Sequence, residues 1–199
     1  MPRPRNQAAR RAQLVRAAAQ TVLERGLTKA RLRDIADQAG VTPASVLYYY
    51  PDINDLLVAV FEQGTETYVL RRHEAVEASA SSWSGLAACI ASGIPFPGEA
   101  ETTSRLLYEL LPVTFRSEAA GERQQAFVAQ QVRLYQRVLD EGAGTGEFRL
   151  AAPSDFLARS FVALEDGYGI DVLSGAATAE QVEGRLLQYA RLVTGAARV

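Results

Sequence analysis

Two adjacent tyrosines, Tyr48 and Tyr49, carry side chains suited to contact with a nucleic acid. Their hydroxyl groups can donate hydrogen bonds to phosphate oxygens, and their rings can pack against thymine methyl groups or sugars. One of the two tyrosines could be buried in a hydrophobic core. Burial of both is less favoured, because adjacent residues on a helix point in different directions. The surrounding residues are small or apolar, and we predict that this segment contacts DNA through Thr42, Pro43, Ala44, Ser45, Leu47, Tyr48 and Tyr49.

Basic side chains are concentrated in the first quarter of the chain. Residues 1–51 hold nine basic and three acidic side chains, a net charge of +6, whereas the whole chain has −2 and the remaining 148 residues therefore have −8. Such a basic region attracts phosphate without sequence preference, and the acidic remainder is kept away from a duplex. Basic tails are often merely solvated, but Lys29, Arg31 and Arg33 flank the tyrosine segment, so we include them among the DNA contacts.

The predicted contacts lie on a pair of short helices. Apolar residues within 32–39 recur at the i, i+3, i+4, i+7 spacing of an amphipathic helix. Gly40 can adopt the left-handed conformation that ends this helix. Thr42 as N-cap and Pro43 in the first turn begin a second helix, which Pro51 ends. Two helices joined by such a turn form a helix-turn-helix, whose second helix normally lies in the major groove.

The flanking segments complete a small domain and extend from it. Residues 1–7 are expected to form a disordered arm, and an alanine-rich helix ending at Gly26 supplies the third helix of the core. From Asn54 to about Ala78 the pattern predicts one helix of about 36 Å, at about 1.5 Å per residue. A tilt of this helix would move the recognition helix. We therefore expect a DNA-binding domain at 1–53 and a helical effector-binding and dimerisation domain at 54–199.

The rest of the chain also reads as helical. Apolar patterns predict helices over 86–94, from 101 to about Pro112, over 118–141 and over 155–175. The last helix begins with Thr178 as N-cap and Gln181 three residues later, a capping box. Because no period-2 alternation persists, the predicted fold class is all-α with about nine helices.

The run GLTKARLRDIADQAGVTPASVLYYYPDINDLL resembles the signature of TetR-type transcriptional regulators across about residues 10–60. The resemblance implies an N-terminal three-helix DNA-binding domain followed by a helical ligand-binding and dimerisation domain. Two positions depart from the family pattern, since Arg31 stands where Thr is common and Ile53 where Lys is frequent. The region from about Phe127 through GEFRL and ALEDGYGIDVLSG is more loosely similar to the effector domain of betaine-pathway-type regulators in that family.

A small-molecule site would be formed between helices of the second domain. Such sites are apolar cavities with a few polar groups, although any one aromatic residue more often fills a core. If Glu165 or Asp166 faced the cavity, a cationic or amine-bearing ligand caged by aromatic rings would fit. The predicted lining residues are Phe61, Tyr68, Trp83, Tyr108, Phe127, Gln131, Tyr135, Phe161 and Glu165.

The last two helices are predicted to form a dimer interface. Their apolar residues cover more of the circumference than a one-sided surface helix needs, and two copies would pair as a four-helix interface. Gly167 and Gly169 favour close backbone packing or a kink. The alternative is a monomer with an ordinary core, but one recognition helix reads few base pairs. The predicted interface residues are Phe161, Tyr168, Val172, Val182, Leu186, Tyr189 and Val193.

Other classes of protein are disfavoured. The sequence has no nucleophile elbow, phosphate-binding glycine loop or Rossmann fingerprint, so we do not expect an enzyme. A single Cys89 and a single His73 leave too few ligands for a transition-metal site, and no cofactor is expected. No uninterrupted apolar stretch reaches the roughly 18 residues of a membrane span, and the basic N-terminus lacks a secretion signal's apolar core. We expect a cytoplasmic protein without a membrane partner.

The expected function is a ligand-modulated repressor whose partners are a near-palindromic double-stranded DNA operator, a second copy of the chain and a small-molecule effector. Binding of the ligand would favour a conformation in which the two recognition helices no longer match the operator. The alternative is a DNA-binding dimer that has no small-molecule effector and is regulated by another protein.

Overall fold

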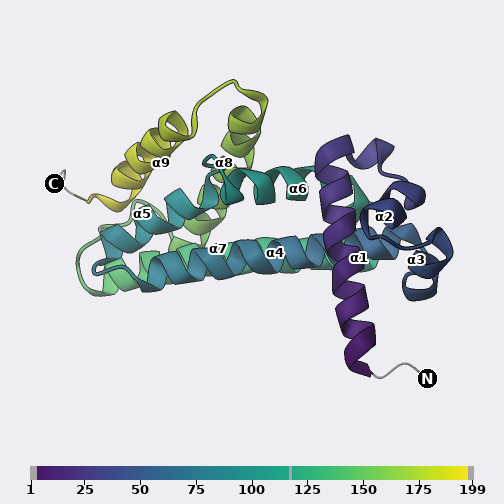
Figure 1. Cartoon of the computed structure of the whole chain (residues 1–199). Coiled ribbons are helices and arrows are strands. Elements are labelled where there is room, and N and C mark those ends of the chain that lie inside the picture. The colour runs from purple at the N-terminus through teal and green to yellow at the C-terminus, as the bar shows by residue number, and fades with distance from the viewer. Residues whose placement is uncertain (1–3, 117, 197–199) are drawn as a thin grey trace. The chain divides into compact units, whose positions relative to one another are not determined.

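The computed structural model describes residues 4–116 and 118–196, within which every regular element is helical (Figure 1). Nine α-helices and one short 3-10 helix are present in these ranges, so the predicted all-α class is confirmed. The elements are α1 Pro4–Arg25, η1 Leu27–Lys29, α2 Leu32–Gln38, α3 Pro43–Tyr49, α4 Ile53–Glu77, α5 Ser82–Gly93, α6 Glu99–Thr114, α7 Glu118–Gly144, α8 Ser154–Ser174 and α9 Ala179–Thr194.

The chain divides into two compact units. The first consists of the residues up to Thr65 together with Arg105–Gln124, and the second of Glu66–Ser104 together with the residues from Gln125 onward. Helices α4, α6 and α7 each contribute residues to both units. The expected domain boundary between residues 53 and 54 falls at the start of α4 and stays a prediction.

The first unit is built on α1, which packs against α2, while α2 packs against α3. The side-chain amide of Gln13 donates a hydrogen bond to the carbonyl oxygen of Ala39 over 2.8 Å. At the other end of α2, Arg25 forms an ion pair with Asp34 at 2.9 Å. Burying the shared apolar face is the main stabilising contribution to this unit; its fully buried side chains include Leu14, Ala18, Val22, Ile35, Ala36, Val46 and Leu56.

The turn between α2 and α3 follows the sequence signals. Gly40 has φ +64°, and its N–H donates to the carbonyl of Asp37 while the N–H of Val41 donates to that of Ala36. These are the two hydrogen bonds of a Schellman motif. The hydroxyl oxygen of Thr42 then accepts a hydrogen bond from the N–H of Ser45 at 3.2 Å. The predicted helix-turn-helix is confirmed.

One expectation on a helix end is wrong, whereas α6 ends near Pro112 as expected. α1 begins at Pro4, so residues 4–7 are helical rather than a disordered arm, and residues 1–3 lie outside the described residues. Proline suits the first helical position, and the residues that follow are good helix formers. α6 includes Pro112 and continues to Thr114. A proline removes one hydrogen bond of the ladder, which near the end of a helix is a small loss.

The second unit has one continuous apolar core. Its buried residues come from α4, α5, α7, α8 and α9 and include Leu86, Cys89, Ile90, Leu139, Leu157, Phe161, Val162 and Leu186. The carboxylate of Glu147 accepts hydrogen bonds from the N–H groups of Ser82 and Trp83, at 2.8 and 2.9 Å, at the start of α5. The predicted capping box between Thr178 and Gln181 begins α9.

Within the described residues, no helix combines the length and the apolar composition that crossing a bilayer requires.

Candidate functional site

Helix α3 turns one side chain inward and most of the others outward. Val46 is fully buried, whereas Leu47 and Tyr48 are 41% and 67% exposed. The rings of Tyr48 and Tyr49 meet edge to face, with centroids 5.1 Å apart. The exposed or partly exposed side chains form a continuous surface that we call the recognition face, namely Thr42, Pro43, Ala44, Ser45, Leu47, Tyr48 and Tyr49.

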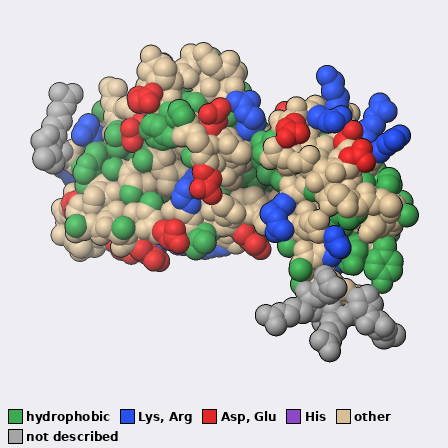
Figure 2. Space-filling view, in the orientation of Figure 1, with side chains coloured by type: hydrophobic (Ala, Val, Ile, Leu, Met, Phe, Trp, Pro, Cys, Tyr) green, Lys and Arg blue, Asp and Glu red, His purple; other side chains and the backbone are tan. Residues whose placement is uncertain are grey.

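Exposed basic side chains lie on the elements that precede α3 in the chain. Lys29 on η1, Arg31 before α2 and Arg33 on α2 are all exposed. Figure 2 shows Lys and Arg side chains projecting from this N-terminal unit. The backbone N–H of Arg31 donates to the carboxylate of Asp34 at 3.2 Å, so an acidic residue helps to begin α2 although arginine has no acceptor for capping. The guanidinium of Arg31 is therefore not needed for capping.

This surface has the chemistry of a nucleic-acid interface. Cations and hydroxyl groups suit phosphate oxygens, while small and apolar side chains allow close approach to base edges and thymine methyl groups. Thr42, Pro43, Ala44 and Ser45 lie at the N-terminal end of α3, which is the end that a recognition helix presents to bases, whereas Leu47, Tyr48 and Tyr49 lie at its C-terminal end.

A second group of polar side chains is buried inside the second unit. At its centre is Arg72 of α4, which is fully buried and forms a two-point ion pair with Glu165 of α8. Nη1 of Arg72 donates to Oε2 of Glu165 over 2.9 Å, and Nη2 donates to Oε1 over 3.1 Å. Burial raises the pKa of the Glu165 carboxyl against the opposing effect of Arg72. Burial also disfavours the charge of Arg72, but the carboxylate of Glu165 keeps the arginine pKa well above its ordinary value.

Three further side chains complete this buried cluster. The hydroxyl of Tyr135 donates to Oε1 of Glu165 at 2.5 Å, and Nη1 of Arg72 donates to Oε1 of Gln131 at 3.2 Å. The hydroxyl of Tyr68 accepts from Arg72 at 2.9 Å and donates to the carbonyl of Gly93 at 3.3 Å. Burial raises the pKa of Tyr68 to about 12, so its hydroxyl stays protonated. We call Tyr68, Arg72, Gln131, Tyr135 and Glu165 the buried cluster.

Helix α5 packs closely against the buried cluster at Gly93. A Cβ atom at Gly93 would lie 2.1 Å from Oε1 of Glu165 and 2.7 Å from Nη1 of Arg72. Because such distances are far below van der Waals contact, a side chain here would displace the ion pair. A Cβ at Gly167, by contrast, would meet nothing within 4 Å, so the expected close packing at Gly167 finds no partner within the described chain.

The structure brings together six of the nine predicted pocket residues. Tyr68, Gln131, Tyr135 and Glu165 contact Arg72, while Phe127 packs on Tyr68 and Phe161 stacks on Tyr135. The other three lie elsewhere. The ring of Trp83 lies under the guanidinium of Arg191 at 5.0 Å, and Phe61 and Tyr108 belong to the first unit.

Sequence reasoning missed Arg72 itself. Phe61, Gly64, Tyr68 and Arg72 follow one another at spacings of three or four residues, so the sequence places Arg72 on the same face of the helix as Tyr68. A charged residue within an apolar stripe signals a buried ion pair, and that signal was present. A cationic ligand is expected only if Glu165 or Asp166 faces a cavity, and both oxygens of Glu165 already accept hydrogen bonds from Arg72 and Tyr135.

The predicted dimer residues divide by burial. Phe161, Val182 and Leu186 have 0–1% of their surface exposed, so they fill the core and cannot contact a partner. This part of the expectation is corrected. Tyr168, Val172, Tyr189 and Val193 are partly exposed. The same two helices also expose three large apolar side chains that were not predicted, Phe156, Ile170 and Leu192.

The first unit contains the three helices α1 to α3 and carries the recognition face on α3, the second helix of its helix-turn-helix. This arrangement is that of the helix-turn-helix class of DNA-binding proteins. Residues 14–60 match the family model described as "Bacterial regulatory proteins, tetR family". A curated relative, the uncharacterized HTH-type transcriptional regulator YfiR of Bacillus subtilis (strain 168), is 22% identical over 163 residues, which are 79% of this chain and 77% of the relative. The N-terminal part of the chain is therefore similar to the DNA-binding domain of TetR family transcriptional regulators.

Solved structures share the fold over nearly the whole chain. One is described as a transcriptional regulator from Saccharomonospora viridis in complex with choline, with 20% identity, a TM-score of 0.85 and coverage of 92% of this chain and 96% of that one. Another is AibR in complex with isovaleryl coenzyme A and operator DNA, with 18% identity, a TM-score of 0.70 and coverage of 94% and 100%. At these identities the likeness concerns the fold.

Proposed function

We propose that this chain is a ligand-responsive repressor that binds a near-palindromic DNA operator as a homodimer. The observation that carries the proposal is the recognition face, where Val46 anchors α3 and the exposed Tyr48 ring points away from the core. The exposed side chains of Lys29, Arg31 and Arg33, on the elements that precede α3, supply charge for phosphate contacts. Tyr48, Tyr49 and the small residues of α3 read base edges, and the cations fix the register on the duplex.

A homodimer is proposed because one short recognition helix reads too few base pairs for a specific site. The exposed apolar side chains Phe156 and Ile170 on α8 and Leu192 on α9 support pairing of these helices between two copies. In a twofold dimer the two α3 helices would enter successive major grooves, about 34 Å apart along the duplex. The operator would then be near-palindromic.

Regulation by a ligand is proposed to start at the buried cluster. Buried charges are costly and are often retained for function rather than for stability. Helices α4, α6 and α7 contribute residues to both compact units, so a shift of these helices can be transmitted to the DNA-binding unit. A ligand releases DNA only if it binds the non-matching conformation more tightly than the matching one. The choline and isovaleryl coenzyme A complexes of the two structural relatives agree with such a site.

Selection of binding sites from a random pool of duplex DNA tests the proposal. The purified full-length chain should enrich a near-palindrome, and the complex should contain two chains per duplex by mass measurement. Release of that duplex by a small molecule would support ligand control, whereas release only by an added protein would favour the alternative of a protein-regulated dimer. Failure to enrich any duplex at low ionic strength would contradict the proposal.

A further inference from the structure

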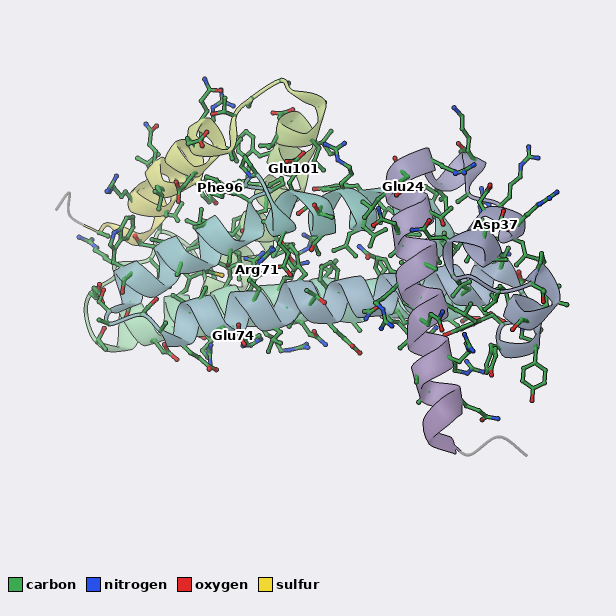
Figure 3. The ribbon with its side chains drawn as sticks, viewed as in Figure 1. Glu24, Asp37, Arg71, Glu74, Phe96 and Glu101 are labelled. Atoms are coloured by element: carbon green, nitrogen blue, oxygen red, sulfur yellow. The ribbon has the colours of Figure 1, made fainter. Side chains whose placement is uncertain are left out.

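Arg71, the residue before the centre of the buried cluster, has buried hydrogen-bond donors for which the described residues offer no acceptor. Its Nη2 donates to the carbonyl of Ser92 on α5 at 3.1 Å, yet its Nε and Nη1 are buried and have no partner. Nε of Arg72 is buried and unpartnered as well. Figure 3 labels Arg71 on the side of α4 that faces α5 and Glu74 on the outer side. Buried N–H groups without acceptors are rare in folded proteins and call for an explanation.

We propose that Arg71 is the docking group for a carboxylate on the effector, which is therefore an organic acid with an apolar body. A guanidinium binds a carboxylate through two parallel N–H···O bonds, either from Nε and Nη2 or from Nη1 and Nη2. The Ser92 carbonyl accepts one N–H of Nη2, so the other N–H of Nη2 can pair with the unpartnered Nε or Nη1 on the same edge. The inference rests on the proposed function, because it names the ligand class of that regulator.

The charges around Arg71 favour an anion. Burial lowers the pKa of Arg71, and the adjacent guanidinium of Arg72 adds a smaller lowering, so a negative charge placed here would stabilise the charged form of Arg71. Glu99 lies within electrostatic range of Arg71 and opposes this lowering, but Nε and Nη1 of Arg71 still lack an acceptor. The negative groups nearest the centre of the cluster are otherwise engaged, since Glu165 is paired with Arg72.

The same geometry disfavours an organic cation. A quaternary ammonium ligand needs a carboxylate or open aromatic faces. Here the guanidinium of Arg72 already pairs with Glu165 and lies 5.4 Å and 5.2 Å from the ring centres of Tyr68 and Tyr135. Arg72 thus occupies the place that such a ligand would take. The guanidinium of Arg71 also lies 5.5 Å from the ring centre of Tyr68, which places an aromatic surface beside the carboxylate site.

Carboxylate binding would act as a switch because the unpartnered nitrogens are shielded from solvent. An acceptor reaches Nε and Nη1 of Arg71 only after neighbouring side chains move. The ligand therefore binds a conformation different from the one described, and this difference in affinity is the condition for shifting an equilibrium. Because Ser92 anchors the third nitrogen, the movement would begin where α4 meets α5.

The experiment uses ligands matched in shape and opposite in charge. Benzoate and benzylamine, octanoate and octylamine, and choline are each added to the full-length chain bound to its selected duplex, and DNA release and the thermal midpoint are measured. We expect at least one carboxylate to release the DNA and to raise the thermal midpoint of the protein. The amine of matching shape should do neither. Release by an amine or by choline, or no response to any carboxylate, would overturn the inference.

Variants then assign the effect to Arg71. Arg71→Ala should abolish the release of DNA by the carboxylate. Arg71→Lys should weaken the affinity for the carboxylate by about tenfold or more, because lysine cannot bind bidentately. Glu74→Ala, on the exposed side of α4, is the control and should leave the release unchanged. Arg71→Met should also raise the thermal midpoint of the ligand-free protein, whereas a purely structural Arg71 would lower it. Each titration also measures DNA binding without ligand, and absence of this binding would contradict the proposed function. If Arg71→Ala binds DNA and still releases it when the carboxylate is added, only the present inference would be overturned.

Discussion

Arg72 and Glu165, 93 residues apart in the sequence, form a two-point ion pair that joins α4 to α8 in the interior of the second unit. Both side chains are almost completely removed from solvent. A pair of charges is costly to bury, and its members tolerate burial only together and with further hydrogen bonds. Tyr68, Gln131 and Tyr135 supply those bonds.

Removing one member of the pair should be strongly destabilising. Arg72→Met leaves the Glu165 carboxylate without its counter-charge, and we expect a loss of about 3–5 kcal/mol in the free energy of unfolding. The double variant Arg72→Met/Glu165→Leu should recover part of this loss, because no unpaired charge then remains. Urea denaturation of the three proteins measures these values. Equal stability of wild type and Arg72→Met would show that the pair is not formed.

Gly93→Ala should act through the same ion pair, because its Cβ would fall 2.1 Å from Oε1 of Glu165. We expect a loss of about 1–3 kcal/mol in the free energy of unfolding, typical of overpacking a filled interior. Gly144→Ala is the matched control, since a Cβ there meets nothing within 4 Å and alanine favours the helix. The close approach would be refuted by urea curves in which Gly93→Ala is as stable as Gly144→Ala.

Glu147→Ala should lower the thermal midpoint at neutral pH, because the carboxylate accepts hydrogen bonds at the start of α5. The backbone N–H of Trp83, followed by that of Ser82, lowers the pKa of Glu147. A carboxyl with a lowered pKa stabilises the fold above its ordinary pKa and loses that effect as the pH falls through the lowered value. Thermal scans across acidic pH should therefore show the difference between wild type and variant shrinking. A difference that does not change with pH would contradict this role.

Much of the first unit could be predicted because its signals are local. The positive φ of Gly40 and the cap at Thr42 are properties of a few consecutive residues, and they determined α2, the turn and α3. The buried cluster could not be predicted in the same way, because Arg72 and Glu165 meet only through tertiary packing. The apolar periodicity placed Leu186 on the buried face of its helix. It did not indicate whether this face packs within the same chain, as the structure has it, or against a second copy.

Arg33→Ala should weaken DNA binding in a salt-dependent manner. Loss of one phosphate contact reduces the slope of log K against log salt by about 0.9. Arg133→Ala on α7 is the matched control, because Arg133 is exposed but lies in the second unit. Fluorescence anisotropy of a labelled duplex over a salt series measures both slopes. Identical slopes for Arg33→Ala and wild type would remove Arg33 from the interface.

The most direct test of the account is the affinity of Tyr48→Ala for the duplex selected by the wild-type chain. Tyr48 is 67% exposed, so its removal should leave the thermal midpoint unchanged. A lost contact at the recognition face should weaken binding by about 1–3 kcal/mol in a fluorescence anisotropy titration. Wild-type affinity in a folded Tyr48→Ala would contradict the assignment of α3 as the helix that reads DNA.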